Sequence, residues 1–97
     1  NGKISSTGAY IKGRQHGPWE FFYEDGQLSH KGDFYLDKQN GAWEYYYPNG
    51  QLSSTGSYEE GENRGLWNYW REDGTKYEEL EFTNDKFVKI LNSWDDK

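Results

Sequence analysis

Aromatic residues and glycines recur along the chain with a period of 24 residues, separated by polar positions. Four sets of residues show the period without any insertion or deletion: Trp19, Trp43 and Trp67; Gly8, Gly32 and Gly56; Gly17, Gly41 and Gly65; Tyr10, Phe34, Tyr58 and Phe82. A fixed period of this length indicates a repeat architecture. The period divides the chain into units of about 2–25, 26–49 and 50–73, followed by a degenerate capping unit at 74–97.

Each unit has the pattern of a β-hairpin. Asp25-Gly26, Asn49-Gly50 and Asp73-Gly74 are typical of two-residue type I′ turns between strands. Such turns fix the facing residues, which are Trp19 with Gly32, Phe21 with His30, Tyr23 with Leu28, Gly17 with Phe34, Trp43 with Gly56, Gly41 with Tyr58, Tyr47 with Leu52, Trp67 with Leu80, and Gly65 with Phe82. The polar stretches 36–41 and 60–65 are expected to be exposed loops between hairpins.

This register places large aromatic rings opposite glycines. A glycine inside a strand costs about 0.5–1 kcal/mol relative to alanine, so a ring lying over the bare backbone is expected to offset that cost. We expect the ring of Trp19 to cover Gly32. The residues predicted to form this scaffold are Trp19, Trp43, Trp67, Gly32, Gly56, Phe34 and Tyr58.

Alternation along the strands sorts the remaining residues between two faces. Trp19 and Phe21 lie on one face, and Glu20 lies on the other with Phe22. The second face is not purely polar, because Phe22, Tyr46 and Trp70 recur on it. Either both faces are partly covered, or a bulge between Trp19 and Phe22 turns both rings to one side.

These observations predict an all-β fold of antiparallel β-hairpin repeats in a single elongated, twisted meander sheet of seven to eight strands. The capping segment 86–94 fits a last strand after an Asn84-Asp85 turn, but also a short helix with Phe87, Ile90, Leu91 and Trp94 on one side. The β-branched residues Val88 and Ile90 favour the strand.

Composition narrows the class of protein. Of the 97 residues, 32% are hydrophobic and 20% are aromatic, so the core must be built largely from rings. The net charge of −6 without a basic run argues against nucleic acid and anionic membrane surfaces as partners. No apolar run is long enough to span a membrane. The chain begins at Asn1 and contains no methionine, which indicates a fragment or processed form and leaves cell envelope and cytoplasm both open.

Little in the sequence points to catalysis. His16 and His30 fall in different contexts and do not recur in the other units. Glu78, Glu79 and Glu81 form an acidic cluster, but successive residues alternate across a strand and cannot all converge on an ion. No nucleophile or phosphate-loop motif is present. We therefore expect no enzyme activity, no metal and no cofactor.

Three segments carry a family resemblance: GAYIKGRQHGPWEFFYEDGQL, GDFYLDKQNGAWEYYYPNGQL and GSYEEGENRGLWNYWREDGTK. They resemble the variant MORN repeat (membrane occupation and recognition nexus), over about residues 1–83, although Asp37 stands where the family has glycine. Bacterial proteins of this kind are labelled as antitoxins of the YwqK type, and others are named after the phosphatidylinositol-4-phosphate 5-kinases that carry such repeats. The resemblance implies a hairpin-repeat sheet for protein or membrane association, with no activity of its own.

A single-layer sheet cannot hide both of its faces, so the second aromatic set is the candidate binding surface. Uncovered aromatic patches mark partner sites, and the surrounding acidity suggests a basic protein surface. The predicted partner-binding residues are Phe22, Tyr23, Tyr46, Tyr47 and Trp70. The alternative is a carbohydrate or cell-wall ligand on the aromatic ladder, since the pattern also bears a weaker similarity to choline-binding repeats. The exposed first strand is an edge open to self-association.

Overall fold

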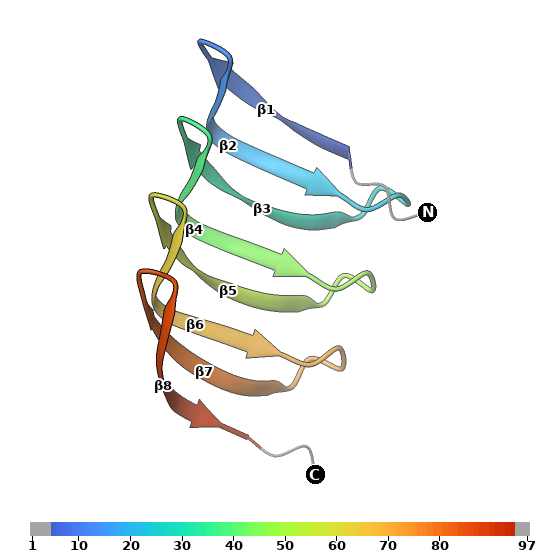
Figure 1. Ribbon diagram of the computed structural model, residues 1–97. Helices are drawn as coiled ribbons and strands as arrows, with labels where there is room; N and C mark the ends of the chain where they lie inside the picture. The colour runs from blue at the N-terminus through green and yellow to red at the C-terminus, as the bar shows by residue number, and fades with distance from the viewer. Residues whose placement is uncertain (1–4, 95–97) are drawn as a thin grey trace.

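The computed structural model describes residues 5–94, which form one antiparallel sheet of eight strands in sequence order. The strands are β1 (Ser5–Ile11), β2 (Arg14–Phe22), β3 (Leu28–Tyr35), β4 (Lys38–Tyr46), β5 (Leu52–Glu59), β6 (Glu62–Trp70), β7 (Lys76–Thr83) and β8 (Lys86–Ser93). Figure 1 shows a twisted meander with β1 and β8 at its two edges. The predicted fold class is confirmed, and 86–93 is a strand rather than a helix.

The predicted register holds across the middle of each hairpin. Trp19 pairs with Gly32, Trp43 with Gly56, and Trp67 with Leu80. It fails next to the turns, because Leu28 pairs with Phe22 rather than Tyr23 and Leu52 pairs with Tyr46 rather than Tyr47. The shift arises because the turns between these strands contain three residues instead of two.

The hydrogen bonds at residues 23–27 define this longer turn. The Gly26 amide donates to the Tyr23 carbonyl at 2.8 Å, and the Tyr23 amide donates to the Gln27 carbonyl at 2.7 Å. Only Gly26 has a positive φ, of 94°, whereas a type I′ turn would require it at Asp25 also. The Asp25 carboxylate instead accepts the Gln27 amide at 2.9 Å. A bulge between Phe21 and Phe22 then restores the register that a two-residue turn would have produced.

The type I′ turns lie at the opposite end of the strands. Positive φ values at both central residues occur in the turns 12–13, 36–37, 60–61 and 84–85. The expectation of loops at 36–41 and 60–65 is therefore wrong, since strands resume at Lys38 and Glu62. Asp37, the departure from the family pattern, has φ 75° and accepts the Gln15 amide through its carboxylate at 2.7 Å.

The indoles of Trp19, Trp43 and Trp67 each lie over a glycine of the preceding strand. A Cβ added to Gly32 would stand 2.2 Å from the ring of Trp43, and the same relation joins Gly8 to Trp19 and Gly56 to Trp67. The expectation that Trp19 covers Gly32 is thus wrong in direction, although the two residues pair. Gly41, with φ 82°, and Ala42 form a bulge immediately before Trp43, and the Trp43 ring then reaches back toward β3.

Candidate binding surface

One face of the sheet carries a continuous layer of rings, which we call the aromatic face. Its centres are Trp19, Trp43 and Trp67, which are 4%, 1% and 3% exposed. The ring of Trp43 meets Phe34 and Tyr58 edge-on, with centroids 5.2 and 6.0 Å away. Neighbouring rings thus take the place that a second layer has in other β folds.

Polar atoms within the aromatic face are mostly satisfied locally. Nε1 of Trp43 donates to the Asp33 carbonyl at 2.9 Å, and Nε1 of Trp19 donates to the Ala9 carbonyl at 3.0 Å. The hydroxyls of Tyr45 and Tyr58 are 2.7 Å apart. Burial raises the pKa of Tyr58 above its ordinary range, with the Tyr45 hydrogen bond acting in the same direction. The Tyr58 phenol therefore remains a neutral hydrogen-bonding group.

His30 belongs to the same layer. Its ring stacks on Phe21 at 4.3 Å and on Tyr45 at 5.4 Å between centroids. Burial lowers the pKa of His30, so the neutral ring is favoured. Its Nδ1 lies 2.9 Å from the hydroxyl of Ser29. His16 lies apart from it and packs against Tyr35, with ring centroids 5.2 Å apart and planes tilted by 53°, so the two histidines do not form one site.

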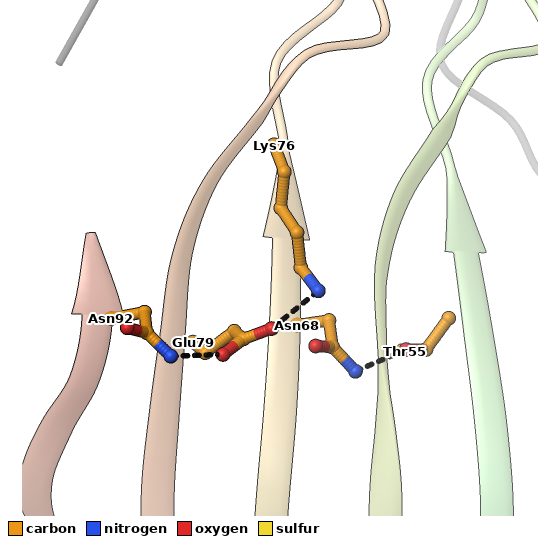
Figure 2. A network of polar contacts seen from close by, with 5 residues as sticks. All are labelled: Thr55, Asn68, Lys76, Glu79 and Asn92. Atoms are coloured by element: carbon orange, nitrogen blue, oxygen red, sulfur yellow. Dashed lines mark hydrogen bonds and ion pairs between the residues drawn. The ribbon is translucent and has the colours of Figure 1, made fainter. Parts of the chain in front are cut away.

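The opposite face, which we call the polar face, carries one residue from each strand in a transverse row. Strand pairing sets these residues side by side in the order Thr7, Glu20, Lys31, Glu44, Thr55, Asn68, Glu79 and Asn92. Figure 2 shows two of the links along this row: Asn68 donates to Thr55 at 3.2 Å and Asn92 donates to Glu79 at 2.7 Å. The row links side chains across strands that are already paired through their backbones.

Near the C-terminal end of the row, Lys76 contacts both a carboxylate and two indole rings. Its Nζ lies 2.5 Å from the Glu79 carboxylate and over the rings of Trp70 and Trp94, at 5.3 and 5.8 Å (Figure 2 shows the first contact). Hydrogen bonds from Lys76 and then Asn92 lower the pKa of Glu79. The predicted acidic cluster is divided, since Glu79 pairs with Asn68 while Glu78 pairs with Tyr69 of the aromatic face. Within residues 5–94, no three histidine or carboxylate side chains group to hold a metal.

Phe22, Tyr46 and Trp70 are partly exposed on the polar face. The hydroxyl of Tyr46 donates to the Glu44 carboxylate of the row at 2.8 Å, and Trp70 contacts Lys76. Phe22 follows Phe21 of the aromatic face and points the other way by strand alternation. Both faces are therefore partly covered, which was the first of the two alternatives considered from the sequence. The bulge beside Phe22 does not turn its ring to the side of Trp19.

Tyr23 and Tyr47 link consecutive hairpins at their turn ends. The Tyr23 hydroxyl donates to the Tyr46 carbonyl at 2.5 Å, and the Tyr47 hydroxyl donates to the Trp70 carbonyl at 2.6 Å. Arg71 stands in the equivalent place and donates to the Trp94 carbonyl at 2.6 Å. These two tyrosines thus have internal partners, which strand alternation alone did not indicate.

A hollow of about 330 Å³ lies on the polar face over β2, β3 and β4. It is lined by Pro18, Trp19, Glu20, Lys31, Gly32, Asp33, Ala42 and Glu44. Three of these are carboxylates and one is a lysine, whose Nζ lies 3.7 Å from Glu44. This hollow was not predicted from the sequence. The alternation of Glu20 with Trp19 and the pairing of Glu20 with Lys31 indicate only that charged side chains gather on this face.

Comparison with known proteins finds one repeat-family model that matches two segments of the chain. Residues 15–37 and 39–60 match the model of the MORN repeat variant. These segments correspond to β2 with β3 and to β4 with β5; the first includes the turn at 36–37, and the second ends at Glu60, the first central residue of the next turn. No curated protein matches the chain. MORN repeats are in general non-catalytic modules that associate with proteins or membranes. No helix that could cross a membrane occurs in the part of the chain from residue 5 to 94.

Proposed function

We propose that this MORN-type repeat sheet is a non-enzymatic module that binds another protein through its polar face. The observation that carries the proposal is a second set of residues on the polar face, Phe22, Tyr46 and Trp70, which we call the aromatic row. These residues recur every 24 residues and are partly exposed beside charged groups. Partly exposed aromatics flanked by polar side chains are the composition of interface hot spots.

Burial on the aromatic face supports the choice of the polar face. A sugar or choline ligand would need open faces on Trp19, Trp43 and Trp67, and those rings are at most 4% exposed. The carbohydrate alternative therefore gains no support from the tryptophan ladder. Phe22, Tyr46 and Trp70 are the partly exposed rings of the polar face that recur in every unit, and their spacing of two strands is about 9–10 Å.

Charge supports a basic protein surface as the partner. The hollow beside the aromatic row holds Glu20, Asp33 and Glu44 against the single cation of Lys31. The net charge of −6 has the same sign and would repel an anionic membrane. An antitoxin role, implied by the family resemblance, would be one instance of such binding.

The test is capture of partners from lysate of the source cells, followed by binding of the purified partner in calorimetry. A triple variant, Phe22→Ser, Tyr46→Ser and Trp70→Ser, is expected to lose at least tenfold in affinity, which corresponds to about 1.4 kcal/mol. Tyr35→Ser is the matched control, because Tyr35 is 59% exposed and lies outside the aromatic row. Equal binding by the triple variant, in a form that melts as a folded sheet, would overturn the assignment of the face.

A further inference from the structure

Exposed large apolar side chains are concentrated on the two edge strands of the described sheet rather than on its interior strands. Nine large hydrophobic residues are exposed in the described chain, and seven of them belong to β1, to β8 or to the residue after β8. These seven are Tyr10, Ile11, Phe87, Val88, Ile90, Leu91 and Trp94. Apolar groups beside unpaired backbone N–H and C=O groups are the features of a strand that accepts another strand.

Within residues 5–94, β1 has the side chains of an interior strand but pairs only with β2. Phe34 contacts the rings of both Trp19 and Trp43, and Tyr58 contacts both Trp43 and Trp67. Tyr10 is the equivalent residue of β1 and is 61% exposed; among the rings of residues 5–94 it contacts only that of Trp19, at 5.2 Å between centroids. One side of the Tyr10 ring is thus open where a further strand would place an apolar group.

The outer edge of β8 offers such groups on the same face. Phe87 pairs with Phe82 and Ile90 pairs with Leu80, which places both on the aromatic face, and they are 56% and 53% exposed. Adjacent strands alternate in direction, so β8 of a second copy placed beside β1 would run antiparallel to it. The lengths also match, at seven residues for β1 and eight for β8.

Charge favours pairing of β8 with β1 over symmetric pairing of two β8 strands. β8 carries Lys86 and Lys89 without an acidic residue, and β1 carries no charged residue. Two β8 edges paired around a two-fold axis would bring these lysines together, whereas β8 against β1 brings them to a neutral strand. Like charges facing each other across strands are destabilising.

From these observations we propose that the β8 edge of one copy pairs with the β1 edge of the next, so that copies assemble head to tail. The aromatic face then continues from one copy to another, with Ile90 near the open side of Tyr10. Such a heterologous contact does not close after two copies and leads to longer stacks.

Sedimentation equilibrium of the 97-residue chain tests the proposal. The mass is expected to rise with concentration beyond that of a dimer. Tyr10→Lys blocks the β1 edge and Ile90→Lys blocks the β8 edge, so each variant alone is expected to stay monomeric. An equimolar mixture, which still contains one intact edge of each kind, is expected to form a 1:1 dimer that grows no further.

Tyr35→Lys and Leu66→Lys are the matched controls, since both residues are exposed but lie on the interior strands β3 and β6. They are expected to assemble like the unmodified chain, and circular dichroism melts establish that all four variants fold. A monomeric parent chain at every concentration would overturn the proposal. So would a Tyr10→Lys variant that still dimerises, which indicates β8–β8 pairing, or a mixture of the two edge variants that stays monomeric.

Discussion

Trp43 and Trp67 occupy the same position in consecutive units and differ in one hydrogen bond. Both rings lie over a glycine of the preceding strand, and they are 1% and 3% exposed. Nε1 of Trp43 donates to the Asp33 carbonyl, whereas Nε1 of Trp67 is buried and has no hydrogen-bond partner among residues 5–94. Because both indoles keep their place, close packing over glycine is what positions them, and the hydrogen bond is a secondary contribution.

The largest expected effect comes from filling the space under the rings. Gly32→Val or Gly56→Val would put a side chain where the ring of Trp43 or Trp67 already lies, because even a Cβ would stand 2.2 or 1.9 Å from it. We expect each variant to lose about 3 kcal/mol of unfolding free energy in urea titrations.

The fourth unit provides the control for these two variants. Leu80 occupies the equivalent place in β7, where a side chain is already accommodated opposite Ile90. Leu80→Val should therefore cost only about 1 kcal/mol. Comparable losses at Gly32 and Leu80 would show that the indole does not depend on a bare backbone.

A smaller effect is expected from removing the indole N–H itself. Trp43→Phe deletes a ring portion and a hydrogen bond to Asp33, whereas Trp67→Phe deletes a similar ring portion and an unpaired N–H. We expect Trp43→Phe to destabilise the sheet by about 1 kcal/mol more than Trp67→Phe in parallel denaturation curves. A larger loss at Trp67 would mean that its N–H finds a partner in solution.

The smallest effect is a pH dependence of stability that distinguishes the second unit from the third. His30 and Ser54 are equivalent residues, facing Tyr45 from β3 and from β5. Burial lowers the pKa of His30 in the folded sheet, so below about pH 6.5 the unfolded chain binds more protons than the folded one. Stability should therefore be full above that pH and decline as the pH falls. His30→Ser, measured by thermal melts across pH, should remove this part of the decline.

The period and strand alternation were enough to predict the sheet, its strand order and the pairing of Trp19 with Gly32. These follow because each unit repeats without insertion and each strand presents alternate residues to one face. The turn types were predicted at the wrong ends of the strands. Asp25-Gly26 suits both a type I′ turn and a three-residue turn, and the Asp25 carboxylate decides between them by accepting the Gln27 amide.

The direction of the rings and the contacts of the polar face could not be read from alternation. Trp43 turns toward β3 because a bulge at Gly41 and Ala42 precedes it, and no rule of pairing places that bulge. Tyr47 shares its sequence context with Tyr46, yet its hydroxyl reaches the carbonyl of Trp70 in the next hairpin. Such contacts depend on side-chain rotamers and on neighbouring units, which lie outside any single hairpin.

The three-residue turns recur in register with the period, at Gly26, Gly50 and Gly74, and extensive contacts join only strands adjacent in sequence. A whole unit such as 26–49 therefore carries its own type I′ turn at 36–37, its own indole, Trp43, and the glycine under that indole, Gly32. Excising that unit would join Asp25 to Gly50 and recreate the same Asp-Gly dipeptide. A repeat protein of this kind can therefore gain or lose whole units during evolution while the turn at each new connection keeps the same sequence.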